Sequence, residues 1–152
     1  QHPDLISKFG GHAMAAGLSL PAAHLPRFQA AFEAVVAQWL QPADLAHQYL
    51  TDGSLSAQEL TLAQAQKLAE PVWGQGFAAP SFVDEFRVAW QRPVGVNHKK
   101  LGLLKEGVLL EAMLFRCQDD LPEHIRAVYR PVANEWRDQI ELQLYVDYWE
   151  AV

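Results

Sequence analysis

Six histidines are the side chains of this 152-residue chain best suited to metal binding or proton transfer. They are spread along it, at His2, His12, His24, His47, His98 and His124. Zinc sites place two histidines one helical turn apart or combine histidine with several cysteines. The chain has neither pattern, and Cys117 is its only cysteine. The sequence therefore predicts no metal site within these residues.

One of these histidines directly follows a pair of glycines, in Gly10-Gly11-His12. Glycines allow the backbone to approach an anion closely. An imidazole can donate a hydrogen bond or bring a positive charge to a phosphate oxygen. We predict a tight turn at the glycine pair, with Lys8 able to add charge near the same anion. An incidental histidine beside a glycine turn is the alternative.

Cations and aromatic rings together can bind a single nucleic-acid strand, because bases stack on rings while cations follow the backbone. The second half of the chain supplies the cations Arg92, His98, Lys99, Lys100, Arg126, Arg130 and Arg137 and the rings Trp90, Tyr129, Trp136, Tyr145 and Trp149. For any single ring a structural role in the core is the favoured alternative. Our preferred DNA-binding patch is Arg92 with His98-Lys99-Lys100, and Arg130 is a further candidate.

The elements that position this patch follow a period of two from Ser81 onward. Alternation predicts strands near 82–91, 99–104, 108–117, 125–133 and 140–149, with a hairpin turn at Lys105-Glu106-Gly107. Five strands in about seventy residues, with a longer connection after the third, fit a closed OB-like barrel. The preferred patch then lies at the first connection and the start of the second strand, where ligands of OB barrels commonly bind.

The first half of the chain predicts helices and short strands. Residues 17–20 suggest a short strand, and apolar residues at helical spacing predict an amphipathic helix over 26–40. Ser56 and Glu59 form a capping box ahead of helix-forming residues 57–69. A stretch rich in glycine and proline at 71–80 predicts a domain junction. We therefore expect an α+β protein divided into residues 1–52, 53–80 and 81–152.

Composition limits which classes of protein the chain can belong to. The net charge of −6 counts against simple electrostatic binding of nucleic acid, so any DNA contact must come from a local patch. No apolar run is long enough to span a membrane, and the first residues lack the features of a signal peptide. A single cysteine suits a reducing compartment, which predicts a cytoplasmic location.

At Gly10-Gly11-His12, with Ala15-Ala16-Gly17 and the strand-like Leu18-Ser19-Leu20 behind it, the chain resembles the DHH-associated domain of the DHH phosphoesterase superfamily. Later segments narrow the resemblance to the RecJ family of single-strand-DNA exonucleases. These are Leu55-Ser56-x-x-Glu59-Leu60, residues 71–80, Val94-Gly95, His98-Lys99-Lys100-Leu101, Ala127-Val128-Tyr129-Arg130 and Asn134-Glu135-Trp136. Val72, Ala78-Ala79 and Lys99 depart from the family pattern.

The resemblance implies that residues 1–52 are the end of a DHH-associated domain and that residues 81–152 are a nucleic-acid-binding OB domain. It implies that His12 contacts a substrate phosphate, with Gly10 and Gly11 letting the strand approach. The parent protein would be a 5′-to-3′ exonuclease of DNA repair and recombination. Its Mn²⁺ or Mg²⁺ ions would be held by a catalytic domain absent from this chain, which alone is expected to be inactive.

Two other interpretations remain open from the residues. The parent can be another DHH phosphoesterase that acts on short oligonucleotides, although such an enzyme has no evident need of a barrel. Alternatively the barrel is a protein-interaction module, which the negative charge favours. Single-stranded DNA is the expected partner of a monomeric chain, with single-strand-binding protein or another repair protein as a further partner.

Overall fold

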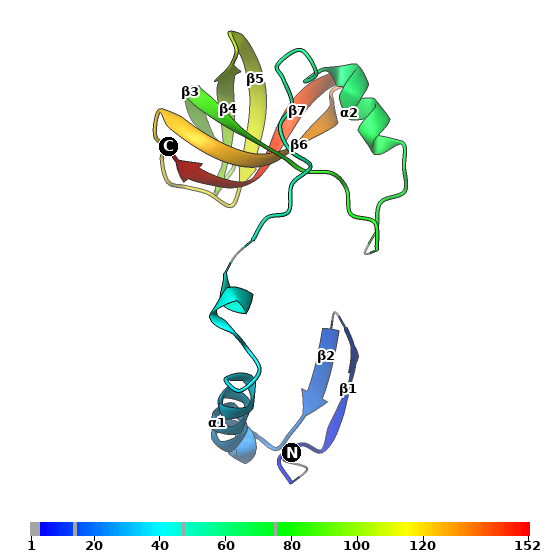
Figure 1. Cartoon of the computed structure of the whole chain (residues 1–152), viewed down its shortest axis with the longest axis vertical. Helices are drawn as coiled ribbons and strands as arrows, with labels where there is room; N and C mark the ends of the chain where they lie inside the picture. Colours follow the sequence, from blue (N-terminus) through cyan, green and yellow to red (C-terminus); the bar gives the residue numbers. More distant parts are fainter. Residues whose placement is uncertain (1–3, 14, 47, 75) are drawn as a thin grey trace. The chain divides into compact units, whose positions relative to one another are not determined.

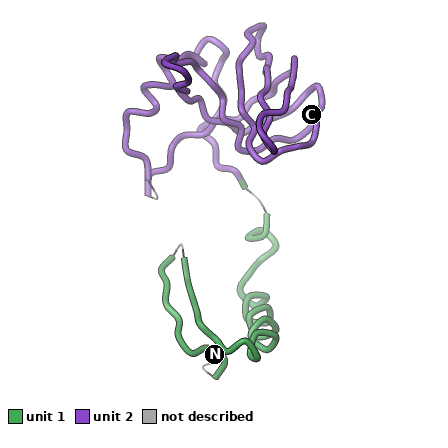
Figure 2. The backbone as a smooth tube through the Cα atoms, turned by 180° about the vertical axis from the view of Figure 1, so that it is seen from behind, with its two compact units in different colours: residues 1–48 green, residues 49–152 purple. Residues whose placement is uncertain are grey.

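A computed structural model describes residues 4–13, 15–46, 48–74 and 76–152 (Figure 1). The chain forms two compact units, residues 1–48 and 49–152 (Figure 2). The division falls a few residues before the expected boundary at 52. The glycine- and proline-rich stretch 71–80, where we expected a junction, lies inside the second unit.

The first unit contains a two-stranded antiparallel sheet, β1 (Lys8–His12) and β2 (Ala15–Ser19), in which His12 pairs with Ala15. Gly10 and Gly11 therefore lie within a strand, which corrects the expected tight turn at the glycine pair. A Cβ atom on Gly11 would lie 2.7 Å from the backbone of Ala15 and Ala16. Glycine is needed here for close approach of the two strands rather than for turning the chain.

The helical part of the first unit is α1 (Leu25–Val36), preceded by the 3₁₀ turn η1 (Ala22–His24) and followed by η2 (Pro42–Leu45). Pro26 occupies the first turn of α1, as expected. The helix ends four residues earlier than predicted. The amide of Trp39 bonds to the carbonyl of Val36 at 2.9 Å, so the chain tightens into i→i−3 turns beyond Val36.

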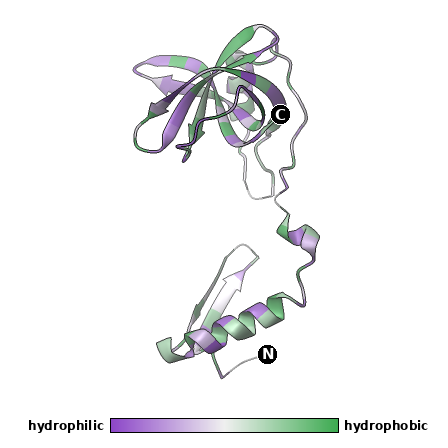
Figure 3. Cartoon of the chain, turned by 90° about the vertical axis from the view of Figure 1, so that its left-hand side faces the viewer, coloured by the Kyte–Doolittle hydropathy of each residue, from purple (hydrophilic) through white to green (hydrophobic). Residues whose placement is uncertain are grey.

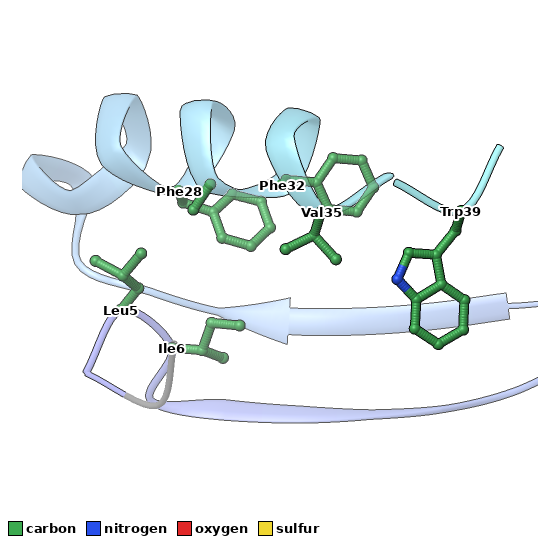
Figure 4. A pocket seen from close by; sticks show the side chains of 7 residues that line it. Leu5, Ile6, Phe28, Phe32, Val35 and Trp39 are labelled. Carbon is green, nitrogen blue, oxygen red and sulfur yellow. The ribbon is translucent and has the colours of Figure 1, made fainter. Parts of the chain in front are cut away.

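The apolar face of α1 lies over the segment that precedes β1. Phe28, Phe32 and Val35 of the helix point toward the side on which Leu5 and Ile6 lie, and Trp39 lies farther along, beyond the end of the helix (Figure 4). Together with Ala31 they line a hollow of about 260 Å³. Within the described part of this unit only Leu5 is fully buried. The periodicity of the helix was thus a sound guide to which residues share a face.

The second unit is built on a closed five-stranded barrel, as the alternation predicted. Its strands are β3 (Phe82–Val94), β4 (His98–Lys105), β5 (Val108–Phe115), β6 (His124–Trp136) and β7 (Gln139–Ala151). They follow one another around the barrel in the order β3-β4-β5-β7-β6, and β3 pairs with β6 to close it. The pair β5–β7 is parallel and the other pairs are antiparallel.

Local sequence explains how the barrel turns and closes. Glu106 and Gly107 both have positive φ, 50° and 82°, as a two-residue hairpin between β4 and β5 requires, so the predicted turn is confirmed. Register shifts in β3 between Val88 and Trp90 and in β6 between Val128 and Tyr129 bend those strands. Apolar and polar residues are mixed along the strands (Figure 3). The apolar side chains that point into the barrel form its core, and Leu101, Leu103, Ile125, Tyr129 and Leu144 are fully buried.

Helix α2 (Leu62–Ala69) is shorter than the predicted 57–69. Only half of the expected capping box forms: the Glu59 carboxylate accepts from the Ser56 amide at 2.8 Å, but the Glu59 amide bonds to the Ser56 carbonyl at 3.1 Å and not to the Ser56 hydroxyl. It closes a turn rather than starting the helix. The cap of α2 is Thr61, whose hydroxyl accepts from the Gln64 amide at 3.2 Å. Leu60 is part of the barrel core, so this segment belongs to the barrel unit.

No helix among the described residues is both long enough and apolar enough to cross a membrane.

Candidate nucleic-acid interface

The outer face of the barrel is hollowed where all five strands contribute side chains. This barrel hollow has a volume of about 460 Å³ and is lined by Arg92, Val94, Lys100, Glu111, Met113, Phe115, Asn134, Trp136, Glu141, Leu142, Gln143 and Tyr145. Its β4–β5 side corresponds to the second and third barrel strands, the face on which OB barrels bind oligonucleotides. The hollow is therefore the candidate interface.

Three of the sequence-predicted cations come together at this hollow. Arg92 and Lys100 are direct partners across β3 and β4, and both line it. Arg92 is exposed and forms no ion pair with any described residue, whereas the Lys100 ammonium lies 2.5 Å from the Glu111 carboxylate. His98 lies beside them, with its ring centroid 5.3 Å from that of Phe115. Its Nδ1 accepts from the Arg116 amide at 3.1 Å, so Nε2 is the nitrogen that can donate to a ligand.

Lys99 is separated from this group. Successive side chains of a strand point to opposite faces, and Lys99 is only 4% exposed. Its ammonium lies 2.5 Å from the Asp120 carboxylate and 3.4 Å from Oε1 of Gln91. The Gln91 side chain also exchanges two 2.9 Å hydrogen bonds with the backbone of Leu121. Lys99 thus fastens the connection between β5 and β6, which corrects the expectation that Lys99 and Lys100 form one patch.

Arg130 also lies outside the hollow. Its guanidinium donates two hydrogen bonds to Asp147, at 2.8 and 2.9 Å. These bonds raise the pKa of Arg130 above its ordinary value. The residue lines a separate groove of about 230 Å³ between α2, the 71–80 segment and β6. The structure therefore does not bring Arg130 together with Arg92 and Lys100.

The aromatic residues divide into platforms and core residues. Trp136 is 68% exposed, and the Arg137 guanidinium lies 5.7 Å from its ring. The Tyr145 ring lies edge-on to Phe115, with centroids 5.2 Å apart, and its hydroxyl donates to Asn134 at 3.3 Å. Tyr129 is fully buried, Trp149 packs against the core, and the Trp90 ring covers Gly102. Only Trp136 and Tyr145 of the predicted rings line the hollow.

Sequence reasoning missed Phe115, which joins His98 and Tyr145 into a row of rings. The signal was available, because Leu110, Ala112 and Leu114 take the buried parity of β5 and leave Phe115 facing outward. An exposed aromatic residue at the end of such a strand is suited to meet a ligand rather than the core.

Sequence reasoning also missed Asp84, a buried carboxylate at the core parity of β3. It accepts hydrogen bonds from the Tyr129 hydroxyl at 2.7 Å, the Ser54 hydroxyl at 2.5 Å and the Leu55 amide at 3.2 Å, and it pairs with Lys105. Burial alone would raise its pKa, but these donors, Lys105 first, hold the pKa of Asp84 below its ordinary value. Burial and the Asp84 charge raise the pKa of Tyr129. The network ties residues 54–55 to the barrel.

Gly10, Gly11 and His12 lie in the first unit, on β1, where all three residues are exposed. An exposed imidazole there is accessible to an anion.

Within residues 4–13, 15–46, 48–74 and 76–152, no group of three or more His, Cys, Asp or Glu side chains could hold a metal ion.

Comparison with known proteins identifies relatives of the whole chain. The RecJ OB domain family matches residues 51–148, which is more than half of the chain. The single-stranded-DNA-specific exonucleases RecJ of Haemophilus influenzae and Escherichia coli are 43% and 36% identical, over 100% and 96% of this chain. The chain spans only 28% and 27% of their lengths.

The fold is also similar to solved structures. RecJ from Thermus thermophilus, crystallised with Mn²⁺, has a TM-score of 0.72 and 24% identity, covering 98% of this chain and 22% of that protein. The same protein with Mg²⁺ has a TM-score of 0.70. The family match covers the barrel together with the α2 segment that packs on it. The chain therefore belongs to the RecJ family, and residues 51–148 are its RecJ OB domain.

Proposed function

We propose that this chain is the strand-binding part of a 5′-to-3′ single-stranded-DNA exonuclease of DNA repair and recombination, and that the barrel hollow holds the DNA. The observation that carries the proposal is the gathering of Arg92, Lys100, Phe115, Trp136 and Tyr145 around one hollow on the β4–β5 face. Relatives that match nearly the whole chain are named as single-stranded-DNA-specific exonucleases.

The geometry of the hollow favours a single strand over a duplex. Rings such as Trp136 and Tyr145 bind bases by stacking, and base faces are free only when the bases are unpaired. Each stacked base contributes about 1–3 kcal/mol. Arg92 at the edge of the hollow can meet a phosphate, as can the Nε2 proton of His98. A duplex offers the same phosphates but hides the faces of its bases.

The cleavage itself is assigned to the parent protein outside this chain. RecJ structures have been solved in complex with Mg²⁺ and with Mn²⁺, and we propose that the parent uses one of these ions. The described residues of this chain contain no suitable ligand cluster, so no step through a metal is assigned to them. The chain alone is expected not to cleave DNA, and in the parent His12 on β1 would contact a substrate phosphate beside Gly10 and Gly11.

Fluorescence anisotropy with labelled oligonucleotides tests the binding proposal. The whole chain should bind a single-stranded oligonucleotide more tightly than a duplex of the same length, with affinity falling as salt rises. Arg92→Ala should weaken binding. Arg126→Ala is the control, because Arg126 is also an exposed arginine but is paired with Glu85 and Glu150 away from the hollow. Absence of binding even at low salt would overturn the proposal.

A second candidate function is the binding of a protein partner, such as single-strand-binding protein or another repair protein. The observation that favours it is the groove beside α2, where Leu68, Trp73 and Pro131 present an apolar surface next to Arg130. Another DHH phosphoesterase as parent is disfavoured by the match to the RecJ OB domain. The expected monomeric state and cytoplasmic location remain part of the proposal.

A further inference from the structure

The charge of the barrel hollow is balanced. Its lining holds two cations, Arg92 and Lys100, and two carboxylates, Glu111 and Glu141. Lys100 is moreover neutralised at short range, since its ammonium lies 2.5 Å from Glu111 and its side chain is 22% exposed. Surfaces that follow a phosphate backbone carry an excess of positive charge. The interior of the hollow therefore does not suit the phosphates of a strand.

A buried amide faces the same hollow. Gln143 of β7 is 8% exposed and lines the hollow. Within the part of the chain that the structure describes, its side chain neither donates nor accepts a hydrogen bond. Among the described residues, Nδ1 of His24 is the only fully buried side-chain nitrogen or oxygen without a hydrogen-bond partner. The unpaired oxygen and nitrogen of Gln143 therefore keep some exposed surface. Buried polar groups are normally paired, so Gln143 is placed to meet a ligand.

Two neighbours of Gln143 in the hollow, Tyr145 and Asn134, add an aromatic ring and further hydrogen-bond donors. Gln143 and Tyr145 share a face of β7, because they are two residues apart. Tyr145 donates its hydroxyl proton to Oδ1 of Asn134, which leaves the Asn134 amide protons free to donate into the hollow. A volume of about 460 Å³ lies within the range of about 300–1,000 Å³ found for small-ligand pockets.

We infer that the hollow receives an unpaired nucleobase, whose ring lies against Tyr145 and Phe115 and whose edge bonds to the Gln143 amide. The inference rests on the proposed binding of single-stranded DNA. The Gln143 amide offers one acceptor and two donors and can turn over, so it can pair with the edge of any base. Phosphates stay at the edge of the hollow, near Arg92. The strand is then held mainly by its bases, without preference for sequence.

The test compares two labelled strands of equal length and equal phosphate number, an oligothymidylate and a strand of abasic residues. Anisotropy with the whole chain should show at least tenfold tighter binding of the oligothymidylate, which corresponds to about 1.4 kcal/mol. Gln143→Met, which keeps the volume but removes the amide, should weaken oligothymidylate binding about fivefold at every salt concentration. It should leave binding of the abasic strand unchanged.

Controls separate this inference from the function on which it rests. Gln66→Met changes an exposed glutamine on α2 and should alter neither affinity, and thermal unfolding confirms that both variants fold. If the unaltered chain binds both strands equally well, or if Gln143→Met binds oligothymidylate as the unaltered chain does, the base-binding hollow is overturned while strand binding stands. If neither strand binds, the proposed function itself fails.

Discussion

Lys99 and Lys100 are neighbours on β4, yet their ammonium groups form ion pairs on opposite faces of the strand. Lys99 meets Asp120 at 2.5 Å and Lys100 meets Glu111 at 2.5 Å. The Lys99 side chain is 5% exposed and the Lys100 side chain is 22% exposed. One lysine holds a loop against the barrel, and the other belongs to the barrel hollow. The two residues should therefore respond differently to the same substitution.

Lys100→Met should weaken binding of single-stranded DNA, because it leaves the Glu111 carboxylate without its counter-charge inside the hollow. The slope of log affinity against log salt should change by clearly less than one, because the phosphates lie at the edge of the hollow near Arg92 and not at Lys100. Glu111→Gln should have the opposite effect and strengthen binding. Anisotropy titrations of the whole chain at several salt concentrations measure both changes.

Lys99→Met is the matched control for Lys100→Met. It keeps the buried stem of the side chain but loses the bond to Asp120, so it should lower the free energy of unfolding by about 1 kcal/mol. Its affinity for DNA should equal that of the unaltered chain. Equal losses of affinity in the two lysine variants would show that the face of β4 does not decide which lysine meets DNA.

The barrel was predictable because alternation over 82–149 fixes which residues face inward, and the Glu106-Gly107 turn fixes the pairing of β4 with β5. The strand that contains Gly10 and Gly11 was not predictable, since glycine serves tight turns and close strand approach equally well. The start of α2 was missed because two capping sequences, at Ser56 and Thr61, compete within six residues. Asp84 escaped notice because its partners Ser54, Lys105 and Tyr129 come together only when the barrel closes.

Of the candidate interface, Arg92, His98 and Lys100 were predicted because strand ends near the first barrel connection are where ligands bind. Lys99 takes the inward parity of Leu101 and Leu103. Its burial was not predicted because a lysine is rarely buried unless it is paired, and its partner Asp120 lies in a loop. Arg130 stays a predicted DNA contact, although it lies outside the hollow. Its two hydrogen bonds to Asp147 could not be foreseen, because they arise from the pairing of β6 with β7.

Phe115→Ala should reduce affinity for single-stranded DNA about fivefold to tenfold, because the row of rings His98, Phe115 and Tyr145 loses its middle member. Tyr148→Ala serves as the control. Tyr148 is a part-exposed ring of the same barrel that stacks on Tyr49 instead, with centroids 5.0 Å apart. If Tyr148→Ala loses as much DNA affinity as Phe115→Ala, the row of rings does not form the DNA contact.

Asp84→Asn should change how stability depends on pH. The pKa of Asp84 is lowered in the folded chain, so its ionised form adds stability above the unfolded pKa of about 3.9. That contribution is lost as pH falls through the folded pKa. The unaltered chain should therefore lose more stability on acidification than Asp84→Asn, and the two should converge at low pH. Thermal unfolding followed by circular dichroism across this range measures the difference.

At neutral pH Asp84→Asn should destabilise the barrel by about 3 kcal/mol, because it leaves the Lys105 ammonium buried without its carboxylate. Tyr129→Phe is a milder variant that removes one hydrogen bond to Asp84 and should cost about 1–2 kcal/mol. Parallel pH profiles for the unaltered chain and Asp84→Asn would rule out Asp84 as the group responsible for acid sensitivity.

His12→Ala in the full-length parent should lower exonuclease turnover about 10²–10³-fold, the loss typical when one donor to a developing negative charge is removed. His12 is exposed on β1, so the variant should still fold, which thermal unfolding checks. Release of nucleotides from a labelled single strand measures turnover, and anisotropy separates weak binding from slow cleavage.

His124→Ala is the control, because His124 is an exposed histidine at the start of β6 and lies outside the barrel hollow. If His12→Ala turns over as fast as His124→Ala, the His12 imidazole does not reach the substrate phosphate. The glycines beside it would then serve only the close pairing of β1 with β2.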